Sequence, residues 1–453
     1  MGQRLDRVTP DDLMSLVAST TSPPLQVGAV LHLDTSSGLD PAGFLAELER
    51  RLPRISRLRQ KLVRVPPWLF GRPVWVDDPD FRMERQVSLL EGYGTSADAS
   101  VMEIAAELLA TPLPEDRPLW AARLVYDLAG SHAALIMVFH HVLADGIAGL
   151  AILSGLVDGS DHPGAVGFPR SAPSHSELAW DALADRCRSI LRLPRSVARI
   201  AGAVTELIPT AACRATPCSL NRPTGPRRRF ASVATDLDRV QRTAHLHQAT
   251  VNDVALTVIT GALRQLLLER GEDVSALVVS IPFSARRRTT GGALGNQSGV
   301  IPLLLPTSGT FESRLATIAS VTTEAKRSPR GASTALLAPA FRLLAAVGRY
   351  QHVIDHQRRV HTFVSNLVGP PERLQLVGCP ITAITPLSIA IGNVTVAFTV
   401  ISYAGELTVT VNADPATCPD LAFLRQALAV ELDLLRAENP IAGGWPLEVR
   451  ALQ

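Results

Sequence analysis

The chain has 453 residues, of which 46% are hydrophobic and 19% are charged, and its formal net charge at pH 7 is +2. At roughly 150 residues per domain this length predicts two or three domains, and the apolar content is too high for a disordered protein. A charge so close to neutral also argues against nucleic acid as a partner, because phosphate binding needs a surplus of basic residues. Only two of the 44 basic residues are lysines, Lys61 and Lys326, and codon bias in a GC-rich genome is the simplest explanation.

The sequence predicts neither a secretory signal nor a membrane-spanning helix. Residues 1–10 carry charges and lack an apolar core, and the apolar stretch 334–348 is interrupted by Arg342. The cysteines are odd in number, scattered, and without the paired spacing of a zinc site; they are Cys187, Cys213, Cys218, Cys379 and Cys418. We therefore expect free thiols, no metal, and a cytoplasmic protein that is soluble or only peripherally attached to a membrane.

Strand and helix patterns alternate through the first part of the chain. Apolar runs predict strands over 25–33 and 133–139, and leucines at helical spacing predict a helix over 41–52. Glycine, proline and serine then become frequent over 158–176, which predicts a loop.

A basic helical stretch separates the two halves of the chain. It covers 180–208, is broken at Pro194, and is followed by a second loop over 209–229. Basic amphipathic helices bind anionic lipid surfaces, but a charged helix face is more often simply solvated, and both interpretations stay open. The arginines concerned are Arg186, Arg188, Arg192, Arg195 and Arg199.

The strand and helix pattern begins again after this connection. A long amphipathic helix is predicted over 250–270 with Asn252 as its N-cap, and Ala404-Gly405 marks a hairpin. Strands are predicted over 230–237, 276–282, 393–403 and 406–412. The pattern indicates two α/β lobes of similar size, an N-terminal lobe over 1–180 and a C-terminal lobe over 230–453, joined by a crossover segment over 181–229.

The most informative segment is His140-His141-Val142-Leu143-Ala144-Asp145-Gly146, which follows the predicted strand 133–139. Successive strand residues point to opposite faces, so only one of the two histidines can easily face a cleft. Histidine can remove a proton from a bound hydroxyl near neutral pH, because its unperturbed pKa is about 6.5. For the pair alone, two structural histidines remain the simpler interpretation. Zinc is disfavoured because adjacent side chains diverge and no helical H-E-x-x-H is present.

This segment resembles the H-H-x-x-x-D-G motif of CoA-dependent acyltransferases and condensation domains. Further motifs resemble one branch, the bacterial wax ester synthase/diacylglycerol acyltransferase family, and they occur in the family's order between about residues 115 and 415. They are Pro118-Leu119-Trp120, Leu220-Asn221 to Phe230, Ala249 to Asp253, Pro282 to Arg286, Leu294 to Gln297, and Ser365-Asn366 to Pro370.

The resemblance implies a two-lobed α/β fold like that of chloramphenicol acetyltransferase, with a channel between the lobes. Acyl-CoA and an alcohol would enter from opposite ends. His141 would act as the general base on the acceptor hydroxyl, while His140 and Gly146 would support the loop. Asp145 would hold that loop through an ion pair with Arg286.

Four polar residues in the matching motifs are candidates for substrate binding or for stabilising the oxyanion, namely Asn252, Asn296, Ser365 and Asn366. Loss of one oxyanion donor typically costs about 10²–10³ in rate. We rank Asn252 first, although helix capping, turns or lobe docking would explain these residues equally well. Pro118 and Trp120 are expected in the core.

The chain departs from the family pattern in four places. Residues Thr9 to Asp12 replace the usual S-P-x-D, no glutamate occurs over 15–23, and Gln26 stands where the family has a Met-His pair. In addition, Val368 replaces a proline. The catalytic histidine is unaffected, but the choice of acceptor and the level of activity stay open.

The implied function is transfer of a long acyl chain from acyl-CoA to diacylglycerol, which gives triacylglycerol. Long-chain alcohols would be a second class of acceptor, and their acylation would give wax esters. Acyl-CoA would be the co-substrate, with no cofactor, and the membrane or lipid-droplet surface would be a peripheral partner. Two alternatives remain. One is a polyketide-associated acyltransferase or stand-alone condensation-type enzyme with a carrier-bound donor, and the other is a catalytically silent lipid-binding protein.

Overall fold

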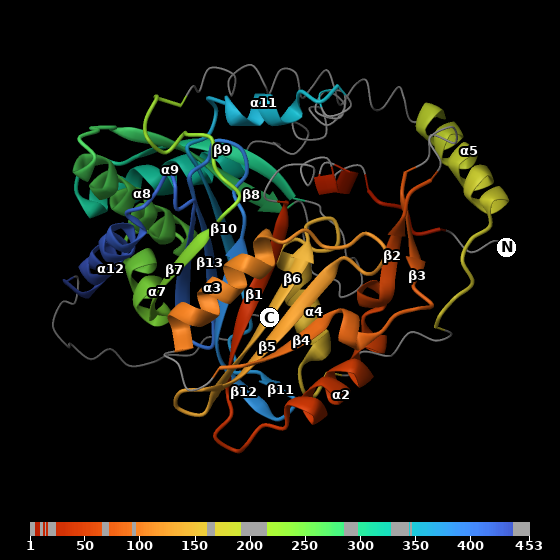
Figure 1. Ribbon diagram of the computed structural model, residues 1–453. Coiled ribbons are helices and arrows are strands. Elements are labelled where there is room, and N and C mark those ends of the chain that lie inside the picture. The colour runs from red at the N-terminus through yellow and green to blue at the C-terminus, as the bar shows by residue number, and fades with distance from the viewer. Residues whose placement is uncertain are drawn as a thin grey trace, which may run out of the picture.

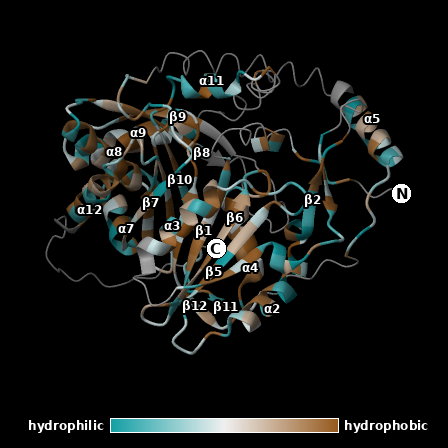
Figure 2. Ribbon diagram, in the orientation of Figure 1, coloured by the Kyte–Doolittle hydropathy of each residue, from teal (hydrophilic) through white to brown (hydrophobic). Residues whose placement is uncertain are grey.

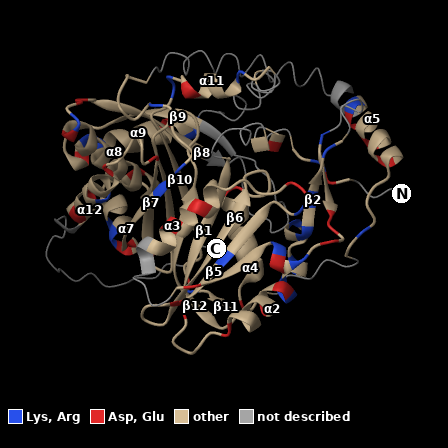
Figure 3. Cartoon of the chain, viewed as in Figure 1, with Lys and Arg blue, Asp and Glu red and all other residues tan. Residues whose placement is uncertain are grey.

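Figure 1 shows a computed structural model of the chain, with two large sheets side by side. The structure describes residues 5–9, 12–13, 15–16, 24–65, 72–92, 97–160, 168–191, 215–284, 298–327, 344 and 347–437. Apolar residues follow the central strands (Figure 2), whereas charged residues gather on the outer helices and loops (Figure 3).

The first sheet has six strands in the order β11-β12-β1-β6-β5-β4. Its central strand β1 pairs antiparallel with β6 on one side and β12 on the other. The helices α2 and α4 cover one face, while α3 covers the other. The bounds are β1 Gln26–Asp34, β4 Val87–Glu91, β5 Trp120–Leu128, β6 His132–His140, β11 Gln375–Leu376, β12 Cys379–Ser388, α2 Pro41–Arg51, α3 Ala97–Ala110 and α4 Gly146–Leu156.

The second sheet also has six strands, in the order β7-β14-β13-β10-β8-β9. Helices α7, α8, α9 and α12 pack on it in one apolar core. The bounds are β7 Arg229–Asp236, β8 Ala276–Ser284, β9 Ser298–Pro306, β10 Thr362–Val368, β13 Val396–Tyr403, β14 Glu406–Ala413, α7 Leu237–Leu246, α8 Val251–Glu269, α9 Phe311–Arg327, α11 Tyr350–Asp355 and α12 Leu421–Ala437.

Smaller elements complete the first half. A two-stranded ribbon of β2 (Gln60–Val63) and β3 (Val74–Asp77) lies beside α5 (His175–Leu191) at the edge of the molecule (Figure 1). Short 3-10 helices cover Leu52–Arg54, Ser56–Arg59 and Met83–Arg85.

Two strands from the second half of the chain belong to the first sheet. The predicted division assigns 230–453 to the C-terminal lobe, yet β11 and β12 pair with each other and β12 pairs with β1. Asp158, directly after α4, holds this hairpin because its carboxylate accepts the backbone N–H groups of Val377 (3.0 Å) and Gly378 (2.8 Å). It also forms an ion pair with Arg51. The two lobes are therefore joined by β12 as well as by the crossover segment.

Most predicted elements are present within a few residues, with three differences. Helix α8 begins one residue after Thr250, whose side chain caps it in a capping box with Asp253, so the prediction of Asn252 as N-cap is wrong. Helix α5 begins at His175, inside the predicted loop 158–176, and the rest of the predicted basic stretch lies outside the described residues. The predicted strand 393–403 is shorter, as β13.

Helix α8 is both long and apolar, with 19 residues from Val251 to Glu269. Among the described residues it is the one helix long and apolar enough to span a membrane, but 72% of its most apolar window is buried inside the fold. Its burial against α9 and α12 is that of a core helix. Four cysteines lie in the described part and are free thiols, namely Cys187, Cys218, Cys379 and Cys418.

Candidate functional site

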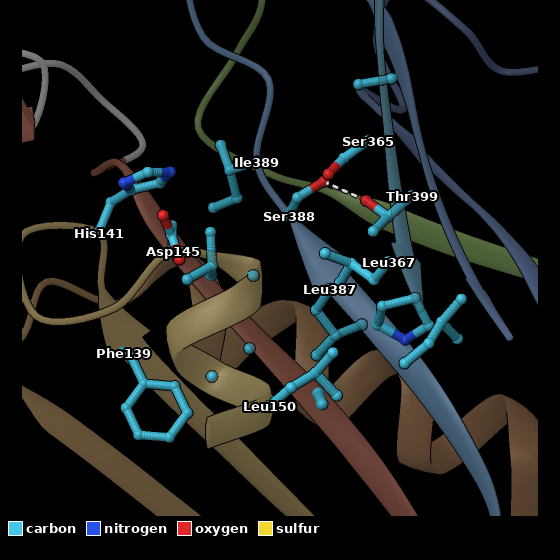
Figure 4. A pocket seen from close by; sticks show the side chains of 18 of the residues that line it. Phe139, His141, Asp145, Leu150, Ser365, Leu367, Leu387, Ser388, Ile389 and Thr399 are labelled. Atoms are coloured by element: carbon cyan, nitrogen blue, oxygen red, sulfur yellow. Dashed lines mark hydrogen bonds between the residues drawn. The ribbon is translucent and has the colours of Figure 1, made fainter. Parts of the chain in front are cut away.

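The H-H-x-x-x-D-G segment opens onto a cavity between the two sheets. β6 ends at His140, the backbone N–H of His141 donates to the carbonyl of Leu25 (3.2 Å), and α4 begins at Gly146. His141, Asp145 and Gly146 line a cavity of about 370 Å³ whose other walls come from β1, β6, β10, β12 and β13. Figure 4 shows His141 and Asp145 on one side and Ser365, Ser388 and Thr399 on the other. The remaining lining is almost entirely apolar.

The electrostatic surroundings of His141 favour the neutral imidazole. Burial lowers its pKa below the ordinary value, although the charge of Asp145, a hydrogen bond to its own backbone carbonyl and the charge of Asp12 act in the opposite direction. The hydroxyl of Ser15 lies 3.4 Å from its Nδ1. A proton on Nδ1 would donate to the residue's own carbonyl, and in this tautomer Nε2 is the nitrogen that accepts a proton. At neutral pH His141 is therefore poised to accept a proton.

His140 is placed differently. It is buried, it does not line the cavity, and its Nδ1 accepts the backbone N–H of Val142 (3.0 Å). Burial lowers the pKa of His140 to about 4, and the neighbouring charge of His141 acts in the same direction. The geometry supports the structural role predicted for this residue, in which it fixes the turn that presents His141.

Asp145 and Gly146 form the start of α4. The carboxylate of Asp145 accepts the backbone N–H of Ala148 (2.8 Å) and so caps the helix. A Cβ on Gly146 would lie 2.7 Å from the side chain of Leu367 on β10. Glycine thus allows α4 to approach the second sheet. Arg286, the predicted partner of Asp145, lies outside the described residues, so that pairing stays a prediction.

Of the four oxyanion candidates the structure describes three, and one of these three lines the cavity. Ser365 on β10 lines the cavity, whereas the next residue, Asn366, points to the other face of the strand and donates to the side-chain oxygen of Asn252 on α8 (3.2 Å). Neither asparagine lines the cavity. Asn296 lies outside the described residues. The structure thus favours Ser365 over Asn252 for contact with substrate, and the Asn252–Asn366 pair joins α8 to β10.

Two hydroxyls of the site were missed by sequence reasoning. Ser388 ends β12 and Thr399 lies on β13, and their side-chain oxygens are 2.7 Å apart at the cavity wall (Figure 4). No motif marks either residue, because their meeting depends on the end of β12, a strand of the first sheet, lying beside β13 of the second. Trp120 and Pro118 are buried as predicted, and the indole N–H of Trp120 donates to the carbonyl of Leu58 (2.7 Å).

Three residues at departures from the family pattern, Gln26, Val368 and Asp12, do not line the cavity. Gln26 is fully buried and its side-chain N–H groups donate to the carbonyls of Leu109 (2.6 Å) and Thr111 (2.9 Å), which ties β1 to the end of α3. Val368 is 84% exposed at the end of β10. Asp12 is buried and accepts the hydroxyl of Thr9 (2.7 Å). Residues 17–23 lie outside the described part.

The groups that line the site suit a substrate that already carries an activated bond, such as a thioester. Among the described residues, no three histidine, cysteine, aspartate or glutamate side chains are grouped to hold a metal ion. The absence of a metal or cofactor nevertheless stays a prediction. What the described residues offer is an apolar cavity, a neutral imidazole and three hydroxyls.

Comparison with known proteins covers nearly the whole chain. The family model of the wax ester synthase/diacylglycerol acyltransferase catalytic domain matches residues 8–255, and the model of the C-terminal domain of the same family matches residues 294–436. A probable diacylglycerol O-acyltransferase of Mycobacterium tuberculosis is 30% identical over 433 residues, covering 89% of each chain. A second putative diacylglycerol O-acyltransferase of that organism is 29% identical and covers 92% of this chain and 87% of its own length.

Solved structures show the same fold. The wax ester synthase/diacylglycerol acyltransferase from Marinobacter aquaeolei VT8 superposes with a TM-score of 0.66 at 23% identity, covering 95% of this chain and 99% of its own. The starter condensation domain of rhizomide synthetase, solved in complex with C8-CoA, gives a TM-score of 0.60 at 17% identity over 95% of each chain. These likenesses confirm the two-lobed α/β fold expected from the sequence.

The burial of His140 leads to a testable titration. Its imidazole takes up a proton at a pKa of about 4 in the fold, whereas the unfolded chain has the ordinary value of about 6.5. The unfolded state therefore binds the proton first as the pH falls, and this group destabilises the fold progressively between those two values. NMR of histidine-labelled protein, assigned with a His140→Gln variant, should show the His140 ring neutral at pH 5. A titration midpoint near 6.5 would contradict the burial of this side chain.

Proposed function

Because the chain belongs to the wax ester synthase/diacylglycerol acyltransferase family, it is an acyl-CoA-dependent O-acyltransferase, and we propose that His141 is its general base and diacylglycerol its acceptor. The observation that carries the proposal is the position of His141 on the wall of the apolar cavity between the sheets. Long-chain alcohols, which would give wax esters, are the second acceptor class.

The cavity fits the hydrocarbon part of such substrates. Its volume of about 370 Å³ lies within the range of small-molecule sites, which are mostly apolar with a few polar groups that fix orientation. Here those groups are His141 and Asp145 on one side and Ser365, Ser388 and Thr399 on the other. A thioester would lie where these polar groups converge, and its hydrocarbon chain would extend along the apolar walls.

The proposed reaction is a direct transfer. Nε2 of His141 takes the proton of the acceptor hydroxyl as its oxygen attacks the thioester carbonyl carbon. The carbon–sulfur bond then breaks, and the imidazolium returns the proton to the departing CoA thiolate, so an ester and free CoA are formed without a further cofactor. Negative charge develops on the carbonyl oxygen, and the hydroxyl of Ser365 is our candidate donor to it.

Replacement of His141 tests this mechanism. With palmitoyl-CoA as donor, we expect CoA release to be stimulated by diacylglycerol and by hexadecanol in the wild type. We expect His141→Ala to lower kcat by about 10²–10⁴, because general base catalysis contributes that much. A His132→Ala variant is the control, because that side chain is exposed and far along β6, and it should retain wild-type rates.

Other outcomes would separate the alternatives. Unchanged release in His141→Ala would refute the general-base role. A wild type that neither acceptor stimulates would favour the catalytically silent lipid-binding protein. Transfer from a carrier-bound donor but not from palmitoyl-CoA would favour the condensation-type or polyketide-associated enzyme.

We further propose that α5 contacts a lipid surface, because diacylglycerol resides in membranes and lipid droplets. One face of the helix is fixed to the first lobe, since Asp181 forms an ion pair with Arg7 and Asp185 with Arg72 (2.8 Å). The other face presents Trp180, which is 72% exposed, and Leu183, which is 50% exposed.

Helix α5 carries charges of both signs, and two of its three acidic residues, Asp181 and Asp185, are paired with arginines of the first lobe. Arg186 is exposed on this helix, and exposed apolar side chains beside a basic residue are typical of interfacial helices. The side chain of Arg188 is not described, and Arg192, Arg195 and Arg199 lie outside the described residues. With this contact the protein would work from the cytoplasm, at the inner membrane face or at lipid droplets.

Flotation with anionic vesicles that contain diacylglycerol tests the contact. The double variant Trp180→Ala/Leu183→Ala should bind at least about 10-fold more weakly, because two large apolar side chains no longer enter the lipid. The control variant Leu246→Ala/Leu268→Ala removes exposed apolar side chains from the second lobe, where they are 61% and 47% exposed, and should bind as the wild type does. Equal flotation of both variants and the wild type would refute the role of α5.

A further inference from the structure

One face of α4 forms a wall of the cavity. Gly146, Gly149, Leu150 and Leu153 all line it, and their spacing of three and four residues places them on the same side of the helix. Two of these four positions are glycines, and the packing around them is very different.

The two glycines differ in the room for a side chain, because only at Gly146 would a neighbouring side chain have to move. A Cβ on Gly146 would collide with Leu367, whereas a Cβ on Gly149 would meet no atom within 4 Å. Glycine inside a helix is less stable than alanine, so the fold itself gains nothing from Gly149. The space that a side chain would occupy at Gly149 is part of the cavity.

The position of Gly149 along the cavity indicates which part of a substrate would occupy the space beside it. It lies three residues beyond Gly146, or about 4.5 Å further along the helix axis, in the direction away from the His141 end of the cavity. Figure 4 shows the neighbouring Leu150 far from His141. Across the cavity from α4 the lining residues of β12 and β13 include Ile384 and Ile401, so this region is apolar on both sides.

We propose that a straight hydrocarbon chain of a substrate passes over Gly149, and that the missing side chain at this position sets how long that chain can be. The inference rests on the proposed placement of the reaction at His141. Both the acyl donor and a fatty alcohol acceptor carry such a chain, and the experiment separates the two. A larger side chain at residue 149 would fill part of this apolar channel, where a Cβ has room.

The test compares chain-length preference in Gly149→Leu, Gly149→Ala and the wild type. In one arm, kcat/KM is measured for C8, C12 and C16 acyl-CoA with one acceptor. In the other arm, octanol and hexadecanol are compared as acceptors with C8-CoA as the fixed donor. In one of the two arms, the ratio of long-chain to short-chain kcat/KM should fall about 10-fold or more in Gly149→Leu, and about 3-fold in Gly149→Ala.

The control is Ala151→Leu, which places a leucine on the exposed side of α4 and should leave both ratios unchanged. The arm that shifts identifies the chain that passes Gly149. Unchanged ratios in both arms would overturn the inference. Gly149→Ala tests the same inference if the leucine variant does not fold, since alanine favours the helix and its Cβ has room. A wild type without acyl transfer at any chain length would instead contradict the proposed function.

Discussion

The site depends on the pairing of β12 with β1. This strand comes from the second half of the chain but completes the first sheet, with Val27 opposite Ser388 and Leu33 opposite Ile381. At the end of β12, the hydroxyl of Ser388 is hydrogen-bonded to that of Thr399 on β13. The backbone carbonyl of Ser388 accepts the side-chain N–H of Asn412 on β14. The same strand therefore belongs to one sheet and is hydrogen-bonded to the other. Its side chains form one wall of the cavity that His141 faces.

The apolar walls of the cavity serve both substrate binding and the protonation state of His141. The apolar walls that can hold a hydrocarbon chain also remove water from His141 and keep its imidazole neutral, as a general base requires. The loop gives each histidine a separate task, because His140 turns inward to accept the N–H of Val142 while His141 faces the cavity. Asp145 contributes through the cap of α4, which fixes the end of that loop.

The sequence predicts the local elements well, and it predicts which histidine of the pair faces the cavity, because these depend on periodicity and on one compact motif. It does not predict the partner of β12, since the alternation of apolar residues defines the faces of a strand but not its neighbours. Thr250 rather than Asn252 caps α8, and the spacing of Thr250 and Asp253 in a capping box was the signal that decides between them. Likewise, the sequence does not show that Ser365 faces the cavity while Asn366 binds Asn252, because this depends on the packing of β10 against α8.

We propose that acyl transfer takes place in the cavity between the two sheets. A crystal structure of the protein with a non-hydrolysable palmitoyl-CoA analogue tests it most directly. We expect the thioester mimic to lie beside His141 and Ser365, with the hydrocarbon chain between α4 and the strands β12 and β13. A hydrocarbon chain bound elsewhere, for example along α5, with the cavity empty would contradict it.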